Sequence, residues 1–78
     1  MAEKLNFTYD RDSDVLYLSS RPQYAEQDSE ELEDEVIARL NPDTGEVEGI
    51  EVLFFSTRLL RSTVVELPVS AYLRLATS

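Results

Sequence analysis

The chain has 78 residues, of which 16 are acidic and 7 basic, and its formal net charge is −9. It contains neither cysteine nor histidine, which excludes disulfides, thiolate metal sites and the commonest general base. A protein this acidic is repelled by nucleic-acid phosphates and by anionic membranes, so we expect neither as a partner. So short a chain forms one domain with a thin core, and self-association is the stabilising device that its composition leaves.

No apolar run approaches the roughly 20 residues of a membrane span. The first residues, Met1–Lys4, lack the charged-then-apolar pattern of a secretory signal. We therefore expect a cytoplasmic protein.

Residues 5–9 alternate apolar and polar side chains, which predicts a strand. The small polar residues 10–14 form a hairpin loop, and residues 15–19 are the return strand. Apolar residues fall on both faces of this second strand, which indicates an interior position in a sheet or contact with a partner. Pro22 ends the strand because proline cannot donate to the ladder.

The stretch from Tyr24 to Glu35 is the most acidic of the chain and has only Leu32 as an apolar anchor. Like charges at helical spacing oppose a helix. We predict a mobile loop with at most one helical turn. Two interpretations of the acidic run remain open: a solvated loop, or a docking strip for a basic protein.

A second hairpin is predicted from Glu35 to Phe55, where two apolar, β-branched runs flank a turn. In that turn Pro42 sets φ for a corner, Asn41 bonds its own backbone, and Gly45 accepts a positive φ. A glycine inside the second strand, Gly49, is typical of a bulge or of a close backbone approach.

The C-terminal third is predicted to contain short elements. Residues 56–57 suit the start of a helix of one or two turns, and residues 64–67 are β-prone and suit a fifth, edge strand. Pro68 stops that strand, and residues 69–76 carry a helical stripe. We expect an α+β fold: an antiparallel sheet of four to five strands, built from two consecutive hairpins, with a short C-terminal helix packed on one face. The stripe consists of Val69, Tyr72, Leu73 and Ala76.

Two strings in these hairpins are similar to a known family. They are Tyr9-Asp10 with the Asp14–Leu18 run, and the G-E-V-E-G-I-E-V-L string at residues 45–53. The chain resembles the small bacterial proteins of the domain of unknown function 2283 family, over roughly residues 5–60. The resemblance implies a compact antiparallel β structure with a small helix, and it implies no activity or catalytic residue. Residues 61–78 form an extension outside the family pattern.

Three carboxylates alternate at the first hairpin tip: Asp10, Asp12 and Asp14. They are similar to the start of a calcium-binding loop, but the required glycine is replaced by Val15 and the required glutamate by Arg21. A solvated turn is the ordinary interpretation, and a weak divalent-cation site is the alternative.

Two further carboxylates, Glu48 and Glu51, flank Gly49-Ile50. Paired carboxylates perform acid–base catalysis when burial separates their pKa values. No nucleophile or oxyanion donor accompanies them, so we interpret Glu51 as a partly buried partner of Arg39. No catalytic residue and no cofactor is predicted.

Aromatic side chains supply the candidate interface. Tyrosines are amphipathic and favour interfaces. Adjacent phenylalanines in a strand point to opposite faces, so one enters the core and the other is covered by the C-terminal segment or by a second chain. The interface candidates are Tyr17, Phe54, Phe55, Tyr72 and Leu73.

These observations favour a small cytoplasmic protein-interaction module without enzyme activity, which forms a homodimer. Its acidity also fits a small basic protein partner, as in the acidic half of a toxin–antitoxin pair. The alternative is a weak divalent-cation-binding or enzymatic protein that uses the acidic hairpin tip or Glu51.

Overall fold

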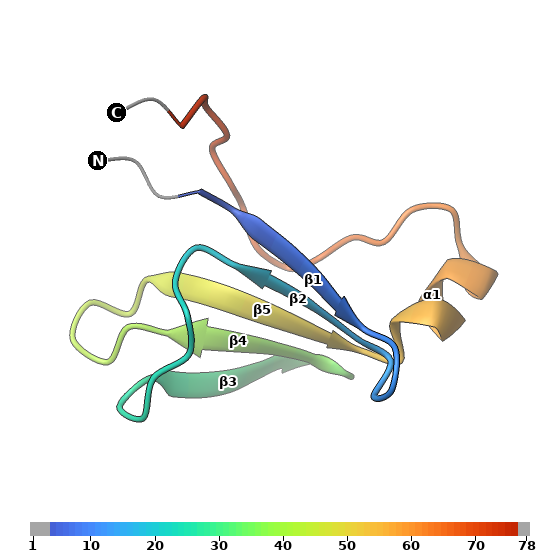
Figure 1. Cartoon of the computed structure of the whole chain (residues 1–78), viewed down its shortest axis with the longest axis horizontal. Helices are drawn as coiled ribbons and strands as arrows, with labels where there is room; N and C mark the ends of the chain where they lie inside the picture. Colours follow the sequence, from blue (N-terminus) through green and yellow to red (C-terminus); the bar gives the residue numbers. More distant parts are fainter. Residues whose placement is uncertain (1–3, 77–78) are drawn as a thin grey trace.

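A computed structural model describes residues 4–76 as one five-stranded sheet and a short helix (Figure 1). The strand order is β1-β2-β5-β4-β3, and every neighbouring pair is antiparallel. This confirms the predicted fold class. The helix is too short to cross a membrane, and the described residues contain no other candidate span. The elements are β1 (Asn6–Asp10), β2 (Val15–Ser19), β3 (Asp28–Glu33), β4 (Val36–Leu40), β5 (Val47–Leu53) and α1 (Phe55–Arg61).

The turn between β4 and β5 has the predicted chemistry. The Asn41 side-chain oxygen accepts hydrogen bonds from the backbone N–H groups of Asp43, at 2.8 Å, and Thr44, at 3.1 Å. Gly45 has φ +76° and donates to the Asn41 carbonyl. A non-glycine residue is strained at such a φ, so these local residues specify the hairpin.

The two hairpins join where β2 pairs with β5, with Leu16 opposite Val52 and Leu18 opposite Ile50. Gly49 lies in this seam, opposite Ser19, and a Cβ added to it would stand 3.3 Å from the Leu18 carbonyl oxygen. The register against β4 also shifts beside Gly49. Both roles predicted for this glycine, the bulge and the close approach, are confirmed.

The predicted mobile loop at residues 24–35 is wrong, because residues 28–33 form edge strand β3, paired with β4. The acidic side chains oppose a helix because like charges repel at helical spacing. On an edge strand they point alternately to the two faces, where water solvates them, and the backbone pairs with a neighbouring strand on one side only. Leu32 is the half-buried anchor, and it packs against the core after a register shift.

Helix α1 begins at Phe55, one residue before the predicted start, and Phe54 precedes it in the left-handed region. Ser56 does not cap the helix from within. Instead, Asp14 of the β1–β2 turn receives the first N–H groups: its carbonyl accepts from Phe55, and its carboxylate accepts from Ser56. A hairpin turn therefore caps the helix, which places α1 at that end of the sheet.

Two C-terminal predictions are wrong. Residues 64–67 form no strand, and residues 69–76 form no helix; the fifth strand is β3. A helix of about eight residues is marginal unless its apolar stripe packs on something, and the described residues provide no surface that covers this one. Residues 77 and 78 of the predicted extension lie outside the described residues.

The core lies on one face of the sheet, around the buried side chains of Val36, Ile50 and Val52. Beyond β5, Phe55 and Leu67 pack against it, so α1 is fastened to this face by Phe55. The other sheet and edge residues packed against the core are Leu16, Leu18 and Leu32.

Candidate functional site

The polar face of the sheet is crossed by the connection between β2 and β3, residues 20–27, which passes in front of β5 and β4 in Figure 1. We call this connection the strap. Two buried carboxylates of β5, Glu48 at 6% exposure and Glu51 at 8%, bind it to the sheet. Each would be costly to bury without partners.

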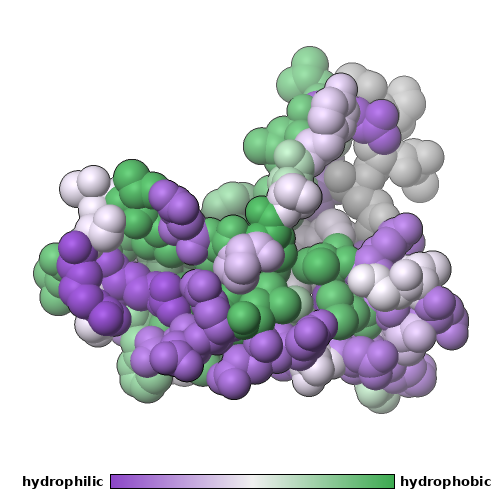
Figure 2. Space-filling model, turned by 180° about the vertical axis from the view of Figure 1, so that it is seen from behind, coloured by the Kyte–Doolittle hydropathy of each residue, from purple (hydrophilic) through white to green (hydrophobic). Residues whose placement is uncertain are grey.

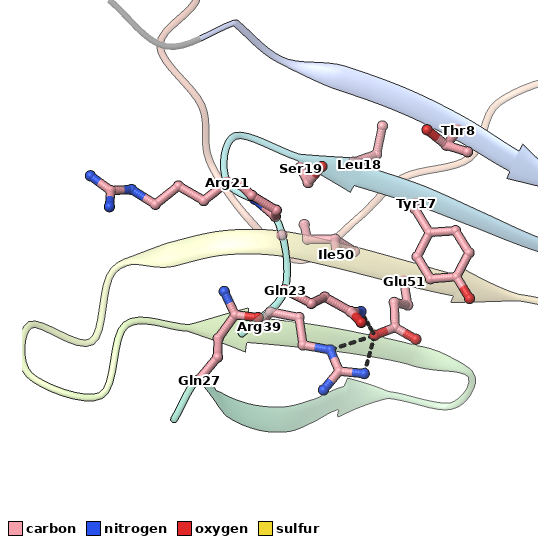
Figure 3. A pocket seen from close by; sticks show the side chains of 12 residues that line it. Thr8, Tyr17, Leu18, Ser19, Arg21, Gln23, Gln27, Arg39, Ile50 and Glu51 are labelled. Atoms are coloured by element: carbon pink, nitrogen blue, oxygen red, sulfur yellow. Dashed lines mark hydrogen bonds and ion pairs between the residues drawn. The ribbon is translucent and has the colours of Figure 1, made fainter. Parts of the chain in front are cut away.

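The first carboxylate, Glu51, pairs with Arg39 on β4 (Figure 3). The Nε and Nη2 atoms of Arg39 both contact Oε2 of Glu51, and Gln23 of the strap donates to the same oxygen at 3.2 Å. The predicted Arg39–Glu51 pair is therefore confirmed. Strand register explains it, because Glu51 lies opposite Ile37 and Arg39 lies two residues further along β4.

The second carboxylate, Glu48, is held by four side chains. Oε1 accepts from the Tyr24 hydroxyl at 2.6 Å and from Gln27 at 3.0 Å, and Oε2 accepts from Asn41 at 3.2 Å. Arg21 adds an ion pair at 3.6 Å. The Tyr24 bond, followed by that of Gln27, lowers the pKa of Glu48, while the same bond raises the pKa of Tyr24 to about 12.

Beside this cluster lies a shallow hollow of about 290 Å³. In Figure 3, Tyr17 and Glu51 lie side by side on one flank of it, and Gln27 belongs to the strap. Both oxygens of Glu48 and Oε2 of Glu51 are already bonded within the chain. The arrangement is suited to holding the strap on the sheet.

Of the three aspartates at the first hairpin tip, Asp10 and Asp14 have carboxylates with different local partners, and Asp12 takes part through its backbone N–H. Asp10 accepts hydrogen bonds from the Ser13 side chain and from the backbone N–H groups of Ser13 and Asp12, and these bonds lower its pKa. Asp14 accepts from the Tyr9 hydroxyl at 2.6 Å and caps α1, and these bonds lower its pKa. Within residues 4–76, no three acidic side chains are grouped in a way that could hold a metal ion.

The opposite face of the sheet carries an apolar groove of about 910 Å³. One wall is formed by the sheet together with Leu5, the residue before β1. The other wall is formed by residues 67–76, which we call the C-terminal segment. Hydrophobic residues are concentrated on this side of the molecule, above a polar lower rim (Figure 2). The sheet wall includes Leu5, Leu18, Val47 and Ile50.

The five predicted interface residues lie in four different places. Tyr72 and Leu73 line the apolar groove, whereas Tyr17 lies on the polar face. Phe55 enters the core and contacts the Tyr9 ring with 6.0 Å between centroids, while Phe54 stays 54% exposed at the end of β5. The structure therefore brings together only two of the five candidates.

Of the residues that line the apolar groove, sequence reasoning proposed only Tyr72 and Leu73 as interface residues; the exposed Leu5, Val47 and Leu75 are among those it missed. A signal existed for Leu75, because Leu73-Arg74-Leu75 alternates in the manner of an extended segment. The contact between Tyr24 and Glu48 had no local signal, because the two residues are 24 positions apart.

A family model described as "Protein of unknown function (DUF2283)" matches residues 6–56. No curated protein and no solved structure is significantly similar to the chain. The matched region spans all five strands and the start of α1, and it excludes the C-terminal segment.

We expect the replacement Arg39→Met to destabilise the protein by about 2 kcal/mol, because it leaves a buried carboxylate without its cation. The double variant Arg39→Met/Glu51→Leu should recover most of that loss, since it removes both charges. Urea unfolding of the single and double variants measures the coupling. Equal stability of Arg39→Met and the wild-type protein would contradict the structural role of the pair.

We expect Tyr24→Phe to lower the free energy of unfolding only within a window of pH. The raised pKa of Tyr24 gives stability that is complete below its ordinary pKa of 10.0 and is lost as the pH rises toward 12. The lowered pKa of Glu48 gives stability that is present above its ordinary 4.5 and is lost as the pH falls further. The difference between wild type and variant should therefore form a plateau between about pH 5 and pH 10.

The measurement is urea unfolding of both proteins across pH 3–12, with Tyr17→Phe as the matched control. Tyr17 lies on the same polar face, and its hydroxyl makes no hydrogen bond to any residue of 4–76, so this variant should not show the same pH window. A Tyr24 effect independent of pH would show that the hydrogen bond to Glu48 is not its cause.

Proposed function

Because the chain belongs to the DUF2283 family, whose description gives no function, we propose a function from the apolar groove. The protein is a small cytoplasmic interaction module without enzyme activity, and it forms a homodimer through that groove. The supporting observation is the groove itself, whose walls carry large apolar side chains open to water.

The apolar side chains that line the groove are strongly exposed to water for so small a protein. Leu5 on the sheet wall is 51% exposed, and Leu73 and Leu75 on the opposite wall are 78% and 86% exposed. A contiguous apolar patch with a polar rim marks an interaction surface, because soluble monomers rarely leave one open. Burying it releases roughly 25 cal/mol per Å² of apolar surface.

Charge supports a second copy of this chain as the occupant. Residues 67–76 contain Arg74 and no acidic residue, in a chain of net charge −9. Each C-terminal segment is therefore complementary to the acidic body of another copy. Both walls of the groove come from one chain, so each subunit carries the complete patch. A two-fold dimer uses the same patch on both subunits, and the groove suits this arrangement.

We expect the wild-type protein to be a dimer at about 100 µM, and Leu5→Glu to weaken the dimer tenfold or more, about 1.4 kcal/mol. A carboxylate buried in an apolar interface loses its hydration without gaining a partner. The measurement is sedimentation equilibrium. Leu59→Glu is the matched control, since Leu59 is also 51% exposed but lies on α1, outside the groove.

A monomeric wild-type protein at this concentration would overturn the proposed function. Equal weakening by Leu5→Glu and Leu59→Glu would show that the added negative charge acts generally, and that the groove is not the interface.

A second candidate function rests on β3. This strand is at the edge of the sheet, and of its six residues only Leu32 is shielded from water. An open strand edge accepts an added strand through backbone hydrogen bonds, and the acidic side chains select a basic one. We propose this edge as the docking place of a small basic protein.

We expect the double variant Glu30→Lys/Glu31→Lys to lose any basic protein that co-purifies with the wild type from its native host. These two residues project to opposite faces of β3, so the variant reverses the charge on both sides of the edge. The control is Glu46→Lys, an exposed acidic residue of the distant β4–β5 turn. Recovery of no basic protein above background, or of the same protein with the β3 variant, would contradict this candidate.

A further inference from the structure

We propose that the dimer is built by exchange: the C-terminal segment of each copy lies in the apolar groove of the other. This rests on the proposed homodimer and specifies the occupant of the groove. The inference starts from the state of residues 67–76 in a single chain.

Residues 70–76 are held by almost nothing within their own chain. Their large side chains, those of Tyr72, Leu73 and Leu75, are between 78% and 86% exposed. Among the described residues, no backbone hydrogen bond involves the chain beyond Val69. A segment with unpaired backbone groups and exposed apolar side chains can bind a second chain through both.

The C-terminal segment is anchored at its first residue, and a turn directly after this residue determines the direction of the chain. Leu67 packs against the core of its own sheet. The next residue is Pro68, whose ring restricts φ, and the Val69 N–H donates back to the Leu67 carbonyl at 2.8 Å. From this tight turn the segment runs behind the sheet and then away from it, past the start of β1 (Figure 1).

Its own groove therefore stays open beneath it. The sheet wall and the C-terminal segment enclose about 910 Å³ without closing on each other. Figure 2 shows the segment as a column rising from the body of the molecule. The segment lines its own groove without filling it, since Tyr72, Leu73 and Leu75 stay exposed; the segment of a second copy can fill the space that remains. Reciprocal exchange of an identical segment is a low-cost route to a dimer.

The chemistry of the segment fits the groove. In extended chain Leu73 and Leu75 lie on one side and Arg74 on the other, so both leucines can face the sheet. Val47 of the sheet wall lies opposite Leu40, and Leu40 lies opposite Asp28. The cross-strand row that begins at Val47 therefore ends in a carboxylate outside the groove lining, within a chain whose acidic body attracts Arg74.

Mixing two defective variants tests the exchange. The donor variant Leu73→Glu/Leu75→Glu has a damaged segment and an intact sheet wall. The acceptor variant Leu5→Glu/Val47→Glu has an intact segment and a damaged sheet wall. Each alone should dissociate into monomers. An equimolar mixture should form a heterodimer at least tenfold tighter than either variant alone, because one intact segment then meets one intact wall.

Sedimentation equilibrium with one variant fluorescently labelled measures this association. If the wild type is a dimer but the mixture stays monomeric, the segment packs within its own copy and the exchange is overturned while the homodimer stands. If the wild type is itself monomeric, the homodimer fails and the exchange fails with it.

Cross-linking keeps the test valid if either variant misfolds. The chain has no cysteine, so Val47→Cys and Leu73→Cys can be placed in separate copies distinguished by an affinity tag of different mass. A short bis-maleimide should join tagged to untagged chains in high yield. Leu60→Cys replaces Leu73→Cys as the control, because Leu60 is equally open to water but lies outside the groove. Equal yields from the two pairs would overturn the exchange.

Discussion

The structure depends on one constraint: a single-layer sheet has one apolar face and too little chain to cover it. After β5, only Phe55 and Leu67 of the described residues pack against the core. A chain of about this length buries only about 60–65% of the surface that it exposes when unfolded. The exposed leucines of the groove and of the C-terminal segment follow from this shortage, because residues 4–76 form no second layer of helix or sheet that would cover them.

The opposite face is covered by different means. The strap crosses it and is held by hydrogen bonds to Glu48 and Glu51 rather than by apolar contact. Buried carboxylates contribute little net stability, because desolvation offsets the attraction of Arg39 and Arg21. They do restrict the geometry, since each oxygen requires a donor at a particular place. One face is thus covered by the chain itself, and the other face is the one through which we propose association.

The sequence was most informative where the structure is local. The β4–β5 turn was predictable because Asn41 and Gly45 act on neighbouring backbone, and the Arg39–Glu51 pair followed from strand alternation. The strand β3 was missed because side-chain repulsion argues against a helix but says nothing against an edge strand. The helix expected at residues 69–76 was wrong because periodicity does not reveal whether a packing surface exists. The contacts of Tyr24 with Glu48 and of Asp14 with Ser56 join distant positions, which only the fold brings together.

Charge explains why an exposed apolar groove need not lead to aggregation. A sheet with two open edges can extend indefinitely by pairing edge to edge. Here the β3 edge carries acidic side chains, so two such edges repel each other and sheet extension from that side is opposed. The groove lies on the apolar face of the sheet. It is bounded by the C-terminal segment, whose one charged residue is Arg74, in a chain that is acidic as a whole. The proposed exchange of two such segments would use both grooves at once and close on itself, so neither groove would stay open to a third copy.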